Sequence, residues 1–530
     1  MPRKTTLLLT CILLASSHIE AKECLSWDNS FATSSNLLIG DIDIIADDIF
    51  KISAKKEHKF FHRAANKLHI TTQAKVIQQQ LLFKQGDAFT QDILAESERL
   101  LRKNRYIKEA HITPVERCGK RVNIRVKTQD NWTLTPGLSF GSSGGKSRSG
   151  ISLQEHNLFG LGKSIALKYK KNSERNSTLL AYKDEQLFGS RKQLAITLKD
   201  NSDGKGFKLN LNQPFYATDS QYAWGLETSS IKQENSFYHQ GDIIKKIGEK
   251  QQAHSAFYGW VSDTAQQRFK VGWTYNKYSY FPTESSNKLA PSSTESYPWF
   301  EVERYHERYI KKTNFKTMDT TEDVAIGQRL NLNIGLLSKA FGSDNNYLRL
   351  SSKLSKSIEV NDNNLSFLTL EGTTYLGKGD LKGNAIQLKN EWYHFDEKAN
   401  DYYVSAQASI ADNLRYGAQT VLGGETGLRG YPLGYQTGNK SVLVSAEKRF
   451  HFNWYPLHIA KFGAVAFADV GSAWGKGNKA KVIADVGVGL RIVPTRSSSG
   501  KIFHLDISAP LVDRKKVDNY QVLIKTSYSF

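Results

Sequence analysis

The sequence predicts a mainly β protein, in which one small α/β domain precedes a transmembrane antiparallel β-barrel. Three observations support this fold class. The chain begins with a secretory signal pattern, helical periodicity is confined to its first quarter, and apolar and polar residues alternate through the remainder. After the first fifteen residues, no apolar run reaches the ~18 residues that a membrane-spanning helix needs. A polytopic helical membrane protein is therefore excluded.

Residues 1–21 have the order of a secretory signal peptide. Arg3 and Lys4 provide a basic start, residues 5–15 are apolar, and Ala21 is a small residue suited to cleavage. A buried N-terminal strand or helix would not need a basic start and a small-residue end in this order. We therefore expect an exported chain whose mature form begins near residue 22.

Residues 22–36 form an N-terminal segment that contains Cys24. Removal of the signal peptide leaves Cys24 and Cys118 as the cysteines of the mature chain. In an oxidising compartment these two residues can form a disulfide. The sequence alone leaves both the paired and the free state open.

Residues 37–130 predict a small domain with the element order β-α-α-β-β. A β-branched apolar run predicts the first strand, and two helical stripes follow, with Thr90 as the cap of the second helix. Two alternating runs then predict two strands. The predicted elements are the strand at 36–45, the helices at 71–84 and 90–101, and the strands at 106–115 and 121–127.

Residues 131–530 predict the barrel, because the helical period disappears and alternation replaces it. In one strand Leu330, Leu332, Ile334 and Leu336 form an apolar face, and polar residues form the other. A soluble β-sandwich would show the same alternation, but the signal peptide and the length favour a barrel with lipid outside and a wet lumen. With about 25 residues for each strand and its loop, against the ~9–11 needed to cross, we expect 16 strands.

Several motifs occur in the order typical of one family. Residues 81–112 contain a Gly-Asp turn between two helices, and residues 155–163 read EHNLFGLGK. A loop motif comprises Leu428, Arg429, Gly430 and Tyr431, a strand motif comprises Phe467, Asp469 and Gly471, and Tyr528 and Phe530 end the chain. With these motifs the chain resembles the outer-membrane assembly and translocation β-barrels, the bacterial surface antigen family of BamA and TamA type. The resemblance implies a C-terminal barrel signal at Tyr528 and Phe530 and a single polypeptide-transport-associated (POTRA) domain at residues 37–130.

The resemblance also implies a role for the loop arginine. In this family a long extracellular loop folds back into the lumen, so Arg429 is expected to pair with Asp469 on a neighbouring strand. A guanidinium can bind a carboxylate through two parallel hydrogen bonds. Gly430 would allow a tight backbone, and Gly471 would leave room beside the carboxylate. The alternative is a surface arginine in a mobile loop, which would contribute little to stability.

A second implication concerns the seam between the first and last barrel strands. Pro136 lacks an N–H group and Gly137 weakens a strand, so the first strand is a poor pairing partner there. In the family this seam opens sideways and can template an incoming strand. Pro136 could equally lie in a linker ahead of the barrel.

The resemblance implies a non-enzymatic protein in the outer membrane of a Gram-negative bacterium, with its N-terminal domain in the periplasm. We expect it to assist insertion of outer-membrane proteins or translocation of a client, by strand templating at the POTRA edge and at the seam. The alternative is a passive channel or a surface structural barrel without insertase activity. A single POTRA domain makes an accessory role more plausible than membership of the central assembly complex.

The expected partners are an unfolded outer-membrane or exported client protein and outer-membrane lipid or lipopolysaccharide, and the barrel is expected to be monomeric. Of the net charge of +20, residues 22–130 carry +5 and residues 131–530 carry +14, which suits lipopolysaccharide phosphates. No motif interleaves aromatic and basic residues, so no nucleic acid is expected. No cofactor or metal is expected either. His58, His62 and His69 lie in a basic amphipathic connector, where no carboxylate or cysteine completes a metal site.

Overall fold

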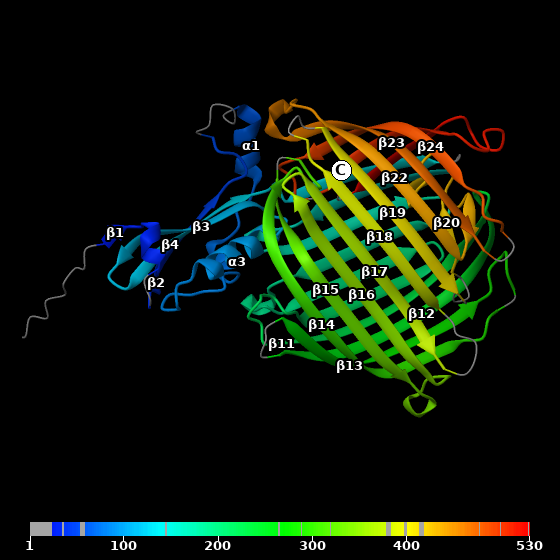
Figure 1. The fold of residues 1–530 in the computed structure, drawn as a ribbon, viewed down its shortest axis with the longest axis horizontal. Helices are drawn as coiled ribbons and strands as arrows, with labels where there is room; N and C mark the ends of the chain where they lie inside the picture. Colours follow the sequence, from blue (N-terminus) through cyan, green and yellow to red (C-terminus); the bar gives the residue numbers. More distant parts are fainter. Residues whose placement is uncertain are drawn as a thin grey trace, which may run out of the picture.

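In the computed structural model, an N-terminal α/β region lies against one end of a large antiparallel barrel (Figure 1). The structure describes residues 24–530 except 34–35, 53–58, 144–145, 263–265, 288, 319, 378–382, 397–399, 413–417, 476–477, 499, 528 and 530, and it leaves out the side chains of 140–143 and 146. The predicted signal peptide at 1–21 lies outside the described residues.

The N-terminal region contains a four-stranded sheet in the order β1-β3-β4-β2 and three helices. Strand β2 runs parallel to β4, whereas β3 pairs antiparallel with both β1 and β4. The elements are β1 (Cys24–Ser26), β2 (Leu38–Asp47), α1 (Phe60–Leu68), α2 (Ala74–Gln78), α3 (Gln91–Arg102), β3 (Ile107–Cys118) and β4 (Arg121–Asp130). The predicted order is thus present, and β1 and α1 are additions to it.

An apolar core lies between the sheet and the helices α2 and α3. Ile77, Leu101, Val122 and Val126 are fully buried in it. The Thr90 hydroxyl accepts a hydrogen bond from the Ile93 N–H at 3.2 Å, which confirms the predicted cap.

The predicted helix at 71–84 is too long, because α2 ends at Gln78. Beyond α2, the Leu82 N–H donates to the Ser97 hydroxyl of α3 at 3.1 Å, and the Gln80 N–H donates to the Ile77 carbonyl. The apolar residues Leu81 and Phe83 reach the core from this turn. Tertiary packing therefore overrides the helical stripe.

The barrel has 20 strands, so the predicted count of 16 is wrong. The estimate of 25 residues per strand failed because the turns are short: six strands, β5 to β10, fit into residues 134–213. The barrel strands are β5 (Leu134–Ser143), β6 (Lys146–Glu155), β7 (Lys163–Lys171), β8 (Asn176–Asp184), β9 (Gln193–Asn201), β10 (Gly204–Gln213), β11 (Tyr222–His239), β12 (Asp242–Val261), β13 (Gln267–Phe281), β14 (Ser293–Thr313), β15 (Thr321–Leu337), β16 (Tyr347–Asn361), β17 (Asn364–Leu376), β18 (Asn384–His394), β19 (Asn400–Asp412), β22 (Lys440–His451), β23 (Ala460–Trp474), β24 (Ile483–Pro494), β25 (Ile502–Pro510) and β26 (Gln521–Ser527).

The strands differ in length around the wall. Strand β5 has 10 residues and β25 has 9, whereas β12 has 20 and β14 has 21. Strand β26 follows β25 and lies next to β5, which closes the barrel. The shorter strands therefore lie on the side of the seam.

Alternation separates the two faces of the wall. Leu330, Leu332, Ile334 and Leu336 of β15 are all exposed on the outer surface, as predicted for lipid-facing positions. The Asn333 amide of the same strand lies beside Glu301 of β14 and Arg349 of β16, which makes a polar inner face. Within the described residues, no helix is long and apolar enough to cross a membrane.

Helix α3 holds the N-terminal region on the barrel rim through ion pairs. Arg102 donates from Nε and Nη2 to the two Asp323 carboxylate oxygens of β15, at 3.0 and 2.7 Å. Glu98 accepts from Lys311 Nζ of β14 at 2.7 Å. The Arg99 guanidinium lies 4.1 Å from the centre of the Tyr309 ring. One face of α3 is therefore matched to β14 and β15.

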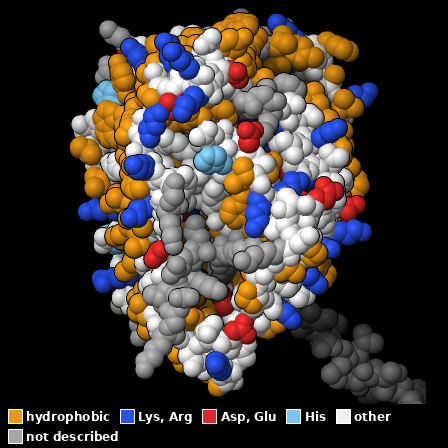
Figure 2. Space-filling model, turned by 90° about the vertical axis from the view of Figure 1, so that its right-hand side faces the viewer, with side chains coloured by type: hydrophobic (Ala, Val, Ile, Leu, Met, Phe, Trp, Pro, Cys, Tyr) orange, Lys and Arg blue, Asp and Glu red, His pale blue; other side chains and the backbone are white. Residues whose placement is uncertain are grey.

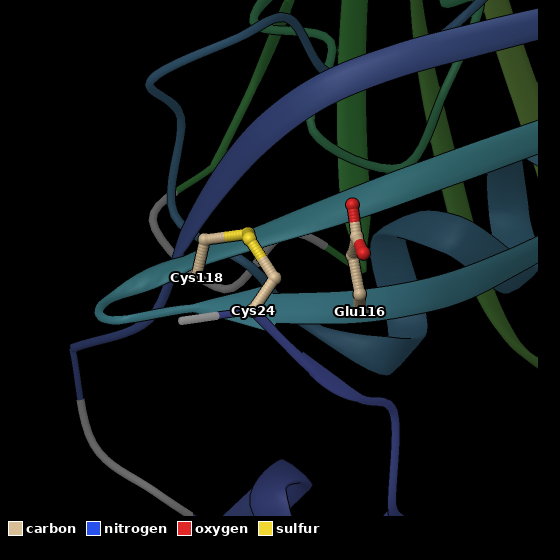
Figure 3. Close-up of side chains that lie close together, drawn as sticks. All are labelled: Cys24, Glu116 and Cys118. Atoms are coloured by element: carbon tan, nitrogen blue, oxygen red, sulfur yellow. A yellow bond between two sulfur atoms is a disulfide. The ribbon is translucent and has the colours of Figure 1, made fainter. Parts of the chain in front are cut away.

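A disulfide joins Cys24 of β1 to Cys118 of β3 (Figure 3). Glu116 lies beside it and accepts a hydrogen bond from Asn123 Nδ2 at 2.8 Å. Because both sulfur atoms are bonded to each other, they are not available as thiolate ligands for a metal ion. The disulfide fixes β1 along the outer edge of β3.

Candidate functional site

The segment between β19 and β22 folds back into the barrel and carries the loop motif. It contains a short hairpin of β20 (Thr420–Leu422) and β21 (Gln436–Gly438). On one side, Gln419 exchanges two hydrogen bonds with the Tyr238 backbone near the end of β11, each 2.9 Å long. On another side, Glu425 forms an ion pair with Arg148 of β6. The segment thus contacts several parts of the wall from inside.

Arg429 lies at the centre of this site and is 7% exposed. Its Nε and Nη2 donate to the two carboxylate oxygens of Asp469 in β23, at 2.8 and 2.9 Å. Its Nη1 donates to Glu447 Oε1 of β22 at 2.9 Å, and its guanidinium lies 3.4 Å from the centre of the Phe467 ring. The structure therefore brings Arg429 and Asp469 together in the two-pronged geometry that suits a guanidinium and a carboxylate.

The backbone around Arg429 makes a tight turn that three neighbours shape. Leu428 is fully buried with a positive φ of 62°, which is uncommon for leucine. At Gly430 a Cβ atom would lie 2.6 Å from Asp485 Cβ and 3.1 Å from the Pro510 nitrogen, so only glycine fits. The fully buried Tyr431 hydroxyl lies 2.9 Å from the Val512 carbonyl oxygen. The four motif residues together fix the loop to the wall.

The space at Gly471 is used differently from the expectation. A Cβ atom there would lie 2.7 Å from the Val442 carbonyl oxygen and 3.3 Å from Leu443 Cδ1. Gly471 therefore allows β22 and the Leu443 side chain to pack closely, rather than leaving room beside the Asp469 carboxylate.

A wider charged network surrounds the pair, and the motifs did not reveal it. Arg449 donates from Nε to Glu447 Oε2 at 3.0 Å, and Arg491 of β24 donates to Asp506 Oδ1 of β25 at 2.5 Å. Asp506 Oδ2 also lies 3.8 Å from Arg429 Nη1. These side chains point inward from consecutive strands, so charged residues at every second position of 440–510 were the available signal.

The seam lies apart from this network, and it contains the predicted weak strand. Pro136 pairs with Leu153 in the β5–β6 register, so it belongs to the barrel and not to a linker. At Gly137 a Cβ atom would lie 2.4 Å from the Ser152 hydroxyl oxygen. Tyr528 and Phe530, the predicted C-terminal signal, lie outside the described residues.

A cavity of about 400 Å³ lies at the seam. Its wall includes Pro136 and Gly137 of β5, Phe503 of β25 and Thr526 of β26. Near the N-terminal region, the chain entering β5 bonds to the β24–β25 turn instead of to β26: the Trp132 N–H donates to the Arg496 carbonyl at 2.6 Å. The seam therefore has a gap along its length and a backbone bridge at one end.

The arrangement is mechanical in character. The buried ion pairs hold a loop inside the barrel, and the described residues contain one cluster of three potential metal ligands, Cys24, Glu116 and Cys118, whose two sulfur atoms are joined. Such a site can fix or release a loop and change how the barrel wall pairs.

Comparison with known proteins agrees with this architecture. The model of the Omp85 superfamily domain matches residues 157–523. No curated protein sequence matches the chain.

Three similar solved structures are outer-membrane barrels. BamA from Haemophilus ducreyi lacking POTRA domains 1–3 is 13% identical, with 93% of this chain and 85% of that chain covered and a TM-score of 0.42. CdiB from Acinetobacter baumannii is 12% identical (92% and 73% covered, TM-score 0.44), and CdiB from Escherichia coli is 12% identical (93% and 77% covered, TM-score 0.47). The domain match covers more than half of the chain and includes both the Arg429 loop and the Asp469 strand, so this protein belongs to the Omp85 superfamily.

Proposed function

We propose that this protein assists the insertion of outer-membrane proteins or the translocation of a client protein, and that the seam between β26 and β5 is where it acts. The cavity at the seam carries this proposal. A strand that cannot donate from Pro136 leaves its neighbour with unpaired backbone groups, and such an edge can pair with an incoming strand. No cofactor is needed for this exchange of backbone hydrogen bonds.

The returning loop supports a gating role. It contacts β6 through Glu425 and β23 through Arg429, and these strands lie on opposite sides of the β26–β5 junction. A loop attached on both sides resists separation of the seam strands. Release of the weaker, more exposed Glu425 contact would leave the loop attached to the β23 side alone.

The N-terminal region is proposed as a single POTRA domain in the periplasm, with residues 37–130 as its extent. One edge of its sheet is covered: β1 pairs with β3, and Glu98 accepts a hydrogen bond from the Ile112 N–H of β3 at 2.9 Å. Strand templating by this domain is therefore proposed for the β2 edge, which lies at the other side of the sheet.

The opposite end of the barrel is proposed to face lipopolysaccharide. Figure 2 shows this end, with lysine and arginine side chains spread around it and hydrophobic side chains on its flanks. Their positive charge complements the phosphates of the lipid surface.

A cross-linking experiment tests the proposal. Cysteine pairs between residues 134–138 of β5 and 523–527 of β26 would lock the seam in protein reconstituted in liposomes, and folding of an unfolded small barrel protein would be followed. We expect locking to abolish acceleration and reduction to restore it. The matched control is a cross-link between Leu388→Cys and Ala408→Cys, which lie opposite each other in β18 and β19 and should leave activity intact.

Two results would contradict the proposal. Full activity of the locked barrel would exclude the seam as the site of action. A large, steady ion conductance in planar bilayers, together with no acceleration of folding, would favour the passive channel instead.

A further inference from the structure

Helix α1 is held firmly against the barrel rim. His62 is buried, and its Nε2 lies 2.9 Å from the carbonyl oxygen of Leu457 in the β22–β23 turn. The Asn66 amide bonds to both the N–H and the carbonyl of Phe50, at 3.1 and 2.8 Å. The Arg496 guanidinium of the β24–β25 turn lies 5.3 Å from the centre of the Phe50 ring. Two barrel turns thus position the helix.

The outward face of α1 is both apolar and basic. Phe60 is 79% exposed and Leu68 is 76% exposed, although both are large hydrophobic residues. Lys59, Arg63 and Lys67 are exposed as well, and α1 itself contains no acidic residue. At 100° per residue, the three cations lie along one flank of this face and the two apolar side chains along the other. A helix facing only water would not need this arrangement.

The turn that α1 contacts continues the same surface. The exposed apolar residues of the turn and its flanks are Phe452, Trp454, Leu457 and Ile459. The turn leads directly into β22 and β23, whose exposed Val442, Val444 and Val470 belong to the lipid-facing belt. In Figure 1, α1 lies beside this turn at the edge of the wall and runs across the direction in which the barrel extends from the N-terminal region.

We propose that α1 and the β22–β23 turn lie in the surface of the phospholipid leaflet next to the N-terminal region, with Phe60 and Leu68 among the acyl chains. Lys59, Arg63 and Lys67 then contact anionic headgroups. Basic amphipathic helices bind membrane surfaces in this way, and tryptophan is favoured at the same depth. The continuity of the apolar surface with the barrel belt, together with the positive charge, identifies a lipid surface as the occupant. The proposal is independent of insertase activity.

Spin-label accessibility tests the proposal on the full chain. Leu68→Cys would be labelled in protein reconstituted in vesicles of phosphatidylethanolamine and phosphatidylglycerol, with the native disulfide kept oxidised. Collisions with oxygen, which concentrates in the bilayer, are compared with collisions with a water-soluble nickel chelate. We expect the oxygen-to-nickel ratio to exceed several-fold that of a label at Lys120→Cys, an exposed position in the β3–β4 turn.

A charge reversal tests the role of the cations. Arg63→Glu with Lys67→Glu should lower the ratio at residue 68 in these vesicles, whereas Lys120→Glu with Arg121→Glu, the same charge change at a distant turn, should leave it unaltered. Equal nickel accessibility at residues 68 and 120 would overturn the proposal. Low accessibility to both reagents that depends on protein concentration would also overturn it, because a second copy of the chain would then cover the helix.

Discussion

Two arginines in this molecule bind their partners in the same way, but in different surroundings. Arg429 and Arg102 each use Nε and Nη2 to bind both oxygens of an aspartate, and each uses Nη1 to contact a glutamate. The Arg429 pair lies within one barrel, and the Asp469 side chain is 1% exposed. The Arg102 pair joins two regions, and the Asp323 side chain is 15% exposed. Identical geometry should therefore give a permanent anchor in the lumen and a weaker, salt-sensitive dock at the rim.

The largest effect is expected from Arg429→Ala. Removing one partner of a buried pair leaves the other charge uncompensated, which costs about 3–5 kcal/mol. The barrel should unfold at a lower temperature, as measured by the heat-dependent shift of its band in gels. Arg429→Lys should fall between the two, because an ammonium cannot bind both oxygens in parallel. Arg308→Ala, which removes an exposed pair with Glu359, is the control; an equal melting temperature for Arg429→Ala and this control would contradict the anchor.

Arg102→Ala should release the N-terminal region and leave the barrel intact. The distance distribution between a spin label on β4 and one on β15 should broaden, and the gel-shift temperature should not change. In the unmodified protein, high salt should broaden the same distribution, because partly exposed ion pairs are screened. If high salt has no effect while the variant broadens the distribution, the contact acts by packing and not by charge.

Docking should also weaken in acid because of Glu98. Burial raises the pKa of this carboxyl group, but hydrogen bonds from Lys311, the Ile112 N–H and Arg102 outweigh it, so the pKa lies below the ordinary value. A lowered pKa means that the contribution to docking is complete above the ordinary pKa and is lost as the pH falls through the lowered value. Below pH ~4.3 the label distances should therefore broaden progressively. Glu98→Gln should show a smaller pH response; an unchanged response would assign the effect to another group.

The smallest effect is expected from Lys311→Ala. The Lys311 side chain is 59% exposed, and exposed pairs contribute at most ~1 kcal/mol. The label distances should broaden only slightly, and less than in Arg102→Ala. A larger change than in Arg102→Ala would reverse the ranking of the two contacts.

The sequence carried the class of fold and the centre of the site, because both depend on local patterns. Alternation marks a strand wherever it lies, and Leu428 to Tyr431 are adjacent in the chain. The number of strands could not be predicted, because it depends on the length of each turn. Glu447, Arg491 and Asp506 come from different strands, and their meeting depends on the register that the closed barrel imposes. Helix α1 lay in a segment that carried only a basic, amphipathic signal.

The unequal strands have a consequence for the thickness of the surrounding bilayer. At ~3.3 Å per residue and a tilt of ~45°, the 9 residues of β25 span roughly 21 Å along the membrane normal and the 20 residues of β12 roughly 47 Å. The hydrocarbon core is ~30 Å thick, so lipids beside β25 meet a wall shorter than themselves. Each ångström of mismatch costs a fraction of a kcal/mol. The bilayer is therefore compressed where the wall is lowest, and a strand entering there has less hydrocarbon to cross.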